Sequence, residues 1–169
     1  MEIVLVFSIL LIVVFLIIPF KSIAIVPDQK VFIVERLGRY HRSLVAGFNV
    51  MLPILDRVAC KMPLNDQVLK IDDLTLKSDN SAQNSIRPTC KLIYRIIDPV
   101  KAAYNVENYV EALKMVVSTF IKNVVGEMEL SESGINNNAP FIKEKIKENA
   151  RDTFESWGLD FVDFHMSIQ

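Results

Sequence analysis

The chain has 169 residues, of which 51% are hydrophobic, and its 19 basic and 20 acidic residues leave a formal net charge of −1. This length allows one domain with a sizeable core. The near-neutral balance argues against a nucleic-acid binder, which usually carries a basic excess. Cys60 and Cys90 lie far apart without a CxxC motif or clustered histidines. That pattern argues against a zinc site or disulfide framework, and we interpret both cysteines as reduced thiols.

The first predicted element is a membrane-spanning helix. From Ile3 to Phe20 the sequence reads IVLVFSILLIVVFLIIPF, interrupted only by Ser8 and Pro19. At about 1.5 Å per residue this helix would be roughly 27 Å long, close to the hydrocarbon thickness of a bilayer. The alternative is a cleaved signal peptide, but no Lys or Arg precedes the apolar run and the run is too long. We therefore expect residues 1–21 to be a retained single-pass anchor.

The distribution of charge predicts the orientation of this anchor. Only Glu2 and the terminal amine precede the apolar run, whereas basic residues follow it. The positive-inside rule then places the N-terminus outside and the C-terminal domain in the cytoplasm, at a bacterial inner membrane or an organelle membrane. The basic residues predicted to contact the anionic membrane surface are Lys21, Lys30, Arg36, Arg39 and Arg42.

The residues after the anchor predict an α+β domain. Short β-prone runs occupy Ile23–Val26, Val31–Glu35, Val68–Ile71 and Leu74–Leu76, and an alternating strand follows from Cys90 to Ile97. The period then changes to that of helices. One helix begins at Asp98-Pro99, a second runs from Asn105 to Gly126, and a third runs from Pro140 to Gly158. A last strand alternates from Val162 to Ile168.

Catalytic motifs are not apparent in the sequence. It contains no GxSxG, P-loop, HExxH or dinucleotide-binding glycine pattern. His41 and His165 are far apart, and neither adjoins a cysteine. Asp72 and Asp73 are neighbours, but on a strand they would point to opposite faces and could not hold a metal together. We expect no catalytic residue, no metal and no cofactor, and we predict that the protein is not an enzyme.

The stretch IVPDQKVFIVERLGRYHRSLVAGFNVMLPILDRV resembles the opening of stomatin-type members of the stomatin/prohibitin/flotillin/HflKC superfamily, also called SPFH or band 7. The residues that carry the resemblance are Val34–Tyr40, Gly47–Asn49, Pro53 and Asp56–Val58, then Tyr94–Ala102, Val106–Tyr109, Val125–Met128 and Trp157-Gly158. The pattern is most similar to the stomatin-like or paraslipin branch. The resemblance implies an SPFH domain over residues 22–169, made of short antiparallel strands with packed helices. Family members continue into a long coiled coil, which is absent from this sequence.

The same resemblance implies roles for individual residues. Gly38, Tyr40, Gly47 and Pro53 are predicted to be structural turn residues, with Tyr40 packed beneath the turn at Gly38. The alternative to a membrane-contact role for Arg36 and Arg39 is a purely structural one, in which they flank this turn near the bilayer.

The function implied by the resemblance is that of a membrane scaffold. Such a protein self-associates at the membrane and organises lipids or modulates membrane proteases or channels. Its expected partners are the bilayer, further copies of itself and a membrane protease or channel. The alternatives are a membrane-tethered enzyme or protease regulator, and a truncated family member that does not assemble. Because Ser8 is the only small residue from Ile3 to Phe20, we expect the domain to supply the self-association contacts, through edge strands or the charged face of the third helix.

Overall fold

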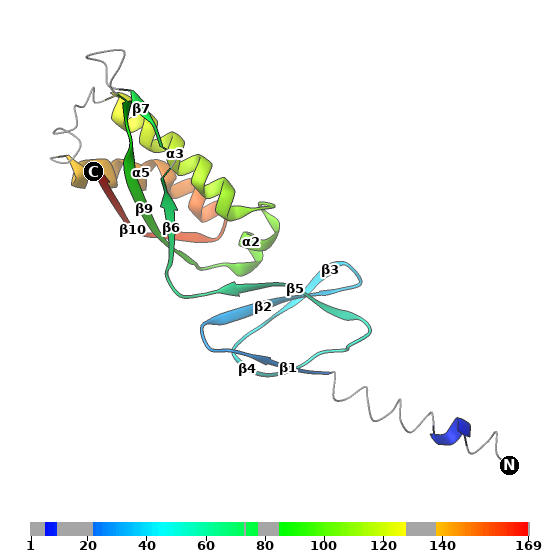
Figure 1. Ribbon diagram of the computed structural model, residues 1–169. Coiled ribbons are helices and arrows are strands. Elements are labelled where there is room, and N and C mark those ends of the chain that lie inside the picture. Colours follow the sequence, from blue (N-terminus) through cyan, green and yellow to red (C-terminus); the bar gives the residue numbers. More distant parts are fainter. Residues whose placement is uncertain (1–5, 10–21, 73, 78–84, 128–137, 169) are drawn as a thin grey trace. The chain divides into compact units, whose positions relative to one another are not determined.

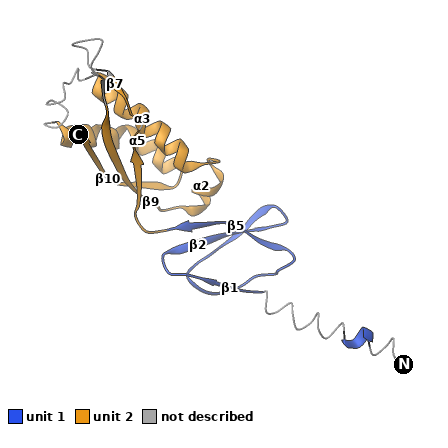
Figure 2. Cartoon of the chain, in the orientation of Figure 1, with its two compact units in different colours: residues 1–63 blue, residues 64–169 orange. Residues whose placement is uncertain are grey.

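The computed structural model describes residues 6–9, 22–72, 74–77, 85–127 and 138–168 (Figure 1). The chain divides into two compact units, residues 1–63 and residues 64–169 (Figure 2). Residues 6–9 are helical, and no helix in the described ranges is both long and apolar enough to cross a membrane. The other residues of the predicted anchor lie outside the described residues.

Unit 1 is built from five short antiparallel strands. They are β1 (Ile23–Val26), β2 (Lys30–Arg36), β3 (Arg39–Leu44), β4 (Gly47–Val50) and β5 (Asp56–Pro63). β1 and β4 pair as a two-stranded ribbon, while β2 is the central strand of a β3-β2-β5 sheet. Val26 of the ribbon is buried with Phe32, Val34 and Leu44 of the sheet. β-Branched and aromatic side chains suit such a half-buried pleated surface, so this cluster joins ribbon and sheet.

In its described residues, unit 2 combines an antiparallel sheet with three helices. Its sheet has the order β10-β9-β6, formed by β6 (Gln67–Ile71), β9 (Pro88–Ile96) and β10 (Leu159–Ile168). β7 (Leu76–Lys77) and β8 (Ser85–Ile86) form a separate pair. The helices are α2 (Pro99–Tyr104), α3 (Tyr109–Glu127) and α5 (Ala139–Ser156). Antiparallel strands with packed helices confirm the predicted mixed fold class.

The core of unit 2 follows from two sequence periods. Along β9, every second side chain is buried, at Cys90, Leu92, Tyr94 and Ile96. The helices bury side chains at spacings of three and four, which are Leu113, Val117, Ile121 and Val124 on α3 and Ile142, Ile146, Ala150 and Phe154 on α5. Each large apolar side chain that is fully buried in this way contributes about 1.5–3 kcal/mol to stability.

The ends of the helices agree only partly with the sequence prediction. Asp98 caps α2 as expected, since its carboxylate accepts hydrogen bonds from the backbone N–H groups of Val100 and Lys101, both at 3.1 Å. The predicted end of the second helix at Gly126 is wrong, because α3 continues through this residue to Glu127. Gly126 does not have the left-handed backbone that usually ends a helix.

Three backbone segments of unit 2 meet at Gly158. This residue follows α5 with φ of 69°, in the left-handed region. Its carbonyl accepts hydrogen bonds from the N–H groups of Ile97 and Asp98, both at 2.9 Å. A Cβ at this position would lie 2.4 Å from the carbonyl oxygen of Asp98. Both the φ angle and the close backbone approach therefore require glycine.

Candidate functional site

An exposed apolar face lies on the ribbon of unit 1. The antiparallel register pairs Ile23 with Val50 and Ile25 with Phe48, so these four side chains share one face of the ribbon. Ile25 is 74% exposed and Phe48 is 68% exposed. On the opposite face, Val26 is buried in the core. The ribbon therefore has apolar side chains on both faces, and the described residues of unit 1 cover only one of them. We call Ile23, Ile25, Phe48 and Val50 the apolar face.

A second exposed apolar group lies at one end of the same unit. Leu37 stands at the tip of the β2–β3 hairpin, and the loop before β5 carries the rest of the group, which we call the apolar end: Leu37, Leu52, Ile54 and Leu55. Leu37 N–H donates to the Leu55 carbonyl at 3.3 Å, and Met51 N–H donates to the Ser22 carbonyl at 2.6 Å. The hairpin tip, the loop and the start of β1 are thus held together. The apolar end adjoins the point at which residue 22 enters the unit.

A partly buried ion pair fixes this end of unit 1. Arg36 donates to Asp56 through Nε at 2.7 Å and through Nη2 at 3.2 Å. Asp56 also accepts the backbone N–H of Leu52 at 2.9 Å, and its side chain is inaccessible to solvent. The hydrogen bonds from Arg36 are the main cause that lowers the pKa of Asp56 from 3.8 to about 2. The pair joins the end of β2 to the start of β5 and to the loop that carries Ile54.

The structure separates the basic residues that the sequence suggested as membrane contacts. Lys30 and Arg36 are the first and last residues of β2, so they lie at opposite ends of that strand. Arg36 is committed to Asp56, and Arg42 donates from Nη2 to the Val50 carbonyl. Arg39 is exposed at the hairpin tip and makes no ion pair within the described residues. Lys21 lies outside those residues.

The hairpin tip has an unusual turn. Leu37 and Gly38 have φ values of 52° and 79°, as in the two-residue turns that match the twist of paired strands. Leucine at positive φ costs about 1–2 kcal/mol, so the tip holds an exposed apolar residue at a conformational cost. Around it, Arg36, Leu37, Arg39, Tyr40 and His41 line an open hollow of about 540 Å³. This hollow gathers exposed basic and apolar groups at one end of unit 1.

The remaining predicted turn residues lie at or near chain reversals, with one difference in packing. Gly47 begins β4 with φ of 110°. Pro53 is the second residue of a turn closed by Leu55 N–H on the Leu52 carbonyl at 3.0 Å. Tyr40 is not packed beneath the Gly38 turn, because the residue is 45% exposed and its hydroxyl lies 3.2 Å from Ser43 Oγ. Its strand, β3, buries only Leu44.

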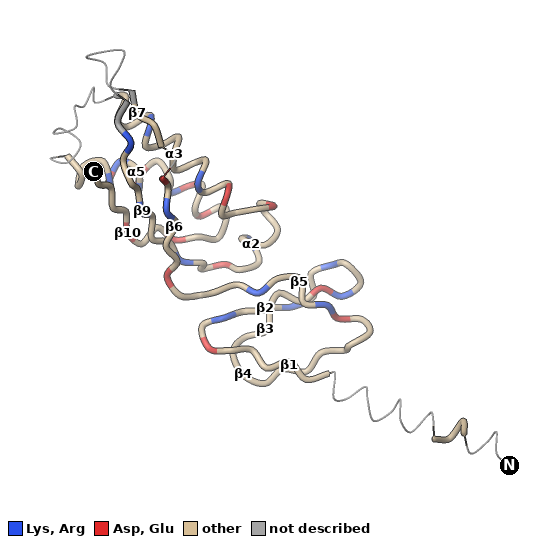
Figure 3. The backbone as a smooth tube through the Cα atoms, viewed as in Figure 1, with Lys and Arg blue, Asp and Glu red and all other residues tan. Residues whose placement is uncertain are grey.

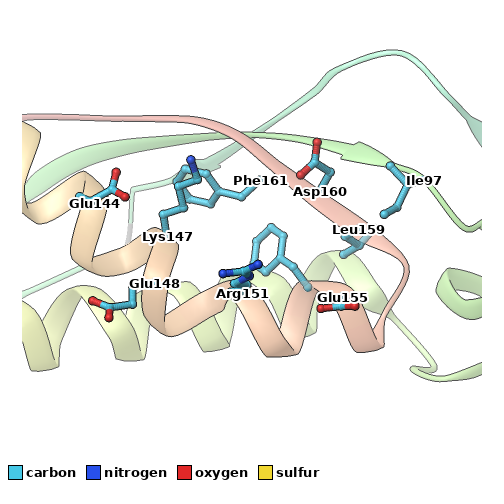
Figure 4. Close-up of a pocket in the computed structure, with 10 residues that line it drawn as sticks. Ile97, Glu144, Lys147, Glu148, Arg151, Glu155, Leu159, Asp160 and Phe161 are labelled. Carbon is cyan, nitrogen blue, oxygen red and sulfur yellow. The ribbon is translucent and has the colours of Figure 1, made fainter.

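Unit 2 has an open groove of about 800 Å³ between α5 and the start of β10 (Figure 4). Lys147 and Arg151 line it, together with four carboxylates, those of Glu144, Glu148, Glu155 and Asp160, and with the apolar side chains of Ile97, Phe154, Leu159 and Phe161. None of these described lining residues is Cys, His, Ser or Thr. The groove therefore combines charges of both signs with apolar side chains, and its described lining has no thiol, hydroxyl or imidazole side chain.

The two thiols are poorly suited to covalent chemistry. Burial raises the pKa of Cys90 to about 12, with a smaller effect from the charge of Asp72. Burial also raises the pKa of Cys60, and the charge of Glu35 adds to this. Both thiols are consequently protonated at neutral pH and are weak nucleophiles. Across the part of the chain that the structure describes, no three His, Cys, Asp or Glu residues form a group that could hold a metal.

Comparison with known proteins identifies the family of the chain. The sequence profile described as "SPFH domain / Band 7 family" matches residues 24–167. An uncharacterized protein of Methanothermobacter thermautotrophicus is 26% identical over 156 residues, which are 92% of this chain and 47% of that protein. Mitochondrial stomatin-like protein 2 of Rattus norvegicus is 29% identical over 145 residues, covering 81% and 38% of the two chains. The human stomatin-like protein 2 is 28% identical over 142 residues, covering 79% and 36%.

The mixed α/β fold and the matched profile together define the class to which this protein belongs. The chain belongs to the SPFH domain / Band 7 family, as its motifs indicated. Within that family it falls in the stomatin-like branch. Members of this group are generally membrane scaffolds without enzymatic activity. The chain spans less than half the length of each of the three relatives.

Proposed function

We propose that this protein is a single-pass membrane scaffold whose unit 1 lies at the membrane surface with its apolar face and apolar end in contact with lipid. The exposed apolar side chains around the entry point of residue 22 carry this proposal. Soluble monomers rarely expose a contiguous apolar patch of this kind unless it binds a protein or a membrane. Here β1, which carries part of the apolar face, follows shortly after the apolar sequence from Ile3 to Phe20, and this supports lipid as the partner.

The charges of the hairpin tip suit the same location. Apolar side chains of a peripheral segment enter the boundary between headgroups and acyl chains, while basic groups remain at the level of the phosphates. Leu37 lies in the two-residue turn and Arg39 begins the strand that follows it, so one tip presents both kinds of group. In this proposal the Arg36–Asp56 pair keeps the tip and the Ile54 loop in place. The two side chains bind each other, so the pair does not have to break when the surface meets lipid.

The wider function follows from the family and remains part of the proposal. The N-terminus lies outside and the two units lie in the cytoplasm. The protein self-associates and thereby organises lipids or modulates a membrane protease or channel. The domain supplies the contacts for self-association, since the apolar N-terminal sequence lacks a small-residue face for tight helix pairing.

Lipid contact can be tested by fluorescence quenching in reconstituted vesicles. Phe48→Cys or Ile54→Cys would be introduced into a Cys60→Ser background of the full chain and labelled with a fluorophore, while Cys90 remains buried. Lipids with a quencher near the headgroup should quench the label at both positions. Ala59→Cys, which is exposed in the same unit but outside the apolar groups, is the control and should stay bright. Equal quenching at all three positions, or at none, would contradict the proposal.

Self-association can be tested separately from lipid contact. Residues Ile3–Phe20 would be replaced by an unrelated membrane helix that is known to be monomeric, and the chain would be crosslinked in membranes. Oligomers should survive the replacement because the domain supplies the contacts. Loss of oligomers after the replacement would mean that the N-terminal segment drives assembly.

A further inference from the structure

One face of the sheet in unit 2 is not covered by the helices that the structure describes. Along β9, the side chains between the buried positions point to the opposite face, and Lys91 and Arg95 are exposed there. Val68 and Lys70 of β6 are exposed in the same alternation, and Val68 is 59% exposed. On β10, Asp160 and His165 are exposed. Among the described residues of unit 2, this face thus carries exposed charged and apolar side chains.

The strand register places three basic side chains in one line across this face. Lys70 is directly opposite Lys91, and Lys91 is directly opposite His165. We call Lys70, Lys91 and His165 the basic row. Figure 3 shows the Lys and Arg positions of the chain, including those on β6 and β9, in blue. Neighbouring strands are about 4.8 Å apart, so the row spans roughly 10 Å.

The lysines of the basic row differ from Arg95, the other exposed basic residue on this face of the described sheet, in how their charges are balanced. Arg95 is balanced by Asp66, whose carboxylate accepts from Arg95 Nε at 2.7 Å. His165 lies 3.1 Å from Asp163. Lys70 and Lys91, by contrast, form no ion pair within the described residues. Like charges directly opposite each other destabilise a sheet, and an acidic partner would relieve that repulsion.

A complementary surface exists on α5 of the same chain. Glu144, Glu148 and Asp152 are exposed and four residues apart, so they form one line along the helix, which we call the acidic stripe. At 1.5 Å rise per residue the carboxylates are about 6 Å apart along the axis, close to the strand spacing of the basic row. Glu148 also contacts Lys145 at 3.1 Å, but both side chains are largely exposed and such pairs contribute little.

We propose that the basic row of one copy binds the acidic stripe of a second copy, with α5 lying across the strands of the neighbouring sheet. The inference rests on the self-association in the proposed function and names the surfaces that produce it. A helix in this orientation places Glu148 opposite Lys91, with Glu144 and Asp152 opposite the outer members of the row. Because the two surfaces are different, the contact is head-to-tail and repeats from copy to copy, which gives a closed ring or an open filament.

The test is a charge exchange in the full chain, purified in mild detergent and measured by sedimentation at several concentrations. Lys91→Glu and Glu148→Lys should each raise the concentration at which half of the chains are assembled, by about tenfold or more. The combined variant should return it towards the value of the unchanged protein. Lys122→Glu reverses an exposed charge on α3 outside both surfaces and should have little effect. Higher salt should weaken the assembly.

Loss of folding can be separated from loss of contact. In the Lys91→Glu variant the new carboxylate stands directly opposite Lys70, so the repulsion between two lysines is replaced by attraction. Its Tm should be equal to or above that of the unchanged protein, although its assembly is weaker. A lower Tm together with weaker assembly, or a combined variant that fails to recover, would overturn the inference.

The remaining outcomes distinguish this inference from the proposed function. If the unchanged protein assembles and neither single variant is affected, the surfaces are wrong while self-association stands. If the unchanged protein remains monomeric, self-association and this inference both fail. If Lys91→Glu reduces binding to anionic vesicles and leaves assembly unchanged, the face contacts lipid headgroups instead of a second copy.

Discussion

Replacing the two most exposed residues of the apolar face, Ile25→Ser together with Phe48→Ser, should strongly weaken binding to lipid vesicles. Ile25 is 74% exposed and Phe48 is 68% exposed, so both have most of their apolar surface available for transfer. Complete burial of such side chains is worth about 1.5–3 kcal/mol each. The exposed parts then contribute about 1–2 kcal/mol each, or about 2–4 kcal/mol together. That loss corresponds to a reduction of about thirty- to several-hundred-fold in the partition coefficient.

The assay is flotation of residues 22–169 with vesicles at increasing lipid concentration. The effect should persist in neutral vesicles and at high salt, because it arises from apolar transfer rather than charge. Met115→Ser is the matched control, since Met115 is 72% exposed on α3. Ile25 and Phe48 point away from the core, so the variant should fold normally. Unchanged partitioning of a folded double variant would refute the lipid-facing role of the ribbon.

Three further predictions concern single residues. The low pKa of Asp56, about 2 instead of 3.8, means that its bridge contributes about 2 kcal/mol of stability above pH 4, which is lost as the pH falls from about 4 towards 2. Urea unfolding at pH 5 and pH 2.5 should show this loss. Asp56→Asn should reduce the pH dependence without removing it, because Arg95 and Lys143 also lower the pKa values of Asp66 and Asp163. Gly158→Ala should lower the free energy of unfolding by about 2–4 kcal/mol, measured by urea unfolding, because it combines positive φ with a clash against Asp98. Arg39→Gln should weaken binding to anionic vesicles by about 1 kcal/mol at low salt and leave binding to neutral vesicles unchanged, as flotation can show.

The periodic elements of the fold could be predicted from the sequence because their signals are local. The alternation along β9 and the Asp98-Pro99 start of α2 both depend on residues close in the chain. The strands β4 and β5 were not predicted, although the residues of β5 alternate between exposed and more buried positions. Each of these strands pairs with one much earlier in the chain, β4 with β1 and β5 with β2. Gly126 was mistaken for a helix end because a glycine signals an end only when the backbone adopts positive φ, which residue type alone does not determine.

The candidate site was less accessible to sequence reasoning. Arg36 and Asp56 both belong to the motifs that identified the family, yet their bridge depends on the register between β2 and β5. The prediction treated Arg36 as a membrane contact because it counted charges along the chain. The apolar face was missed for a related reason. Ile25 and Phe48 are 23 positions apart and become neighbours only through the pairing of β1 with β4.

The hydrogen bonds that join backbone segments at Gly158 also affect the local unfolding of unit 2. α2 has only six residues, too few for a helix to persist alone. Its cap residue, Asp98, is held by the Gly158 carbonyl, which also holds the amide of Ile97. Separation of the end of α5 from this point would release both amides and the first turn of α2 in the same event. Hydrogen exchange should therefore show matching protection for the amides of Ile97 and Asp98, as members of one cooperative unit that links β9, α2 and the end of α5.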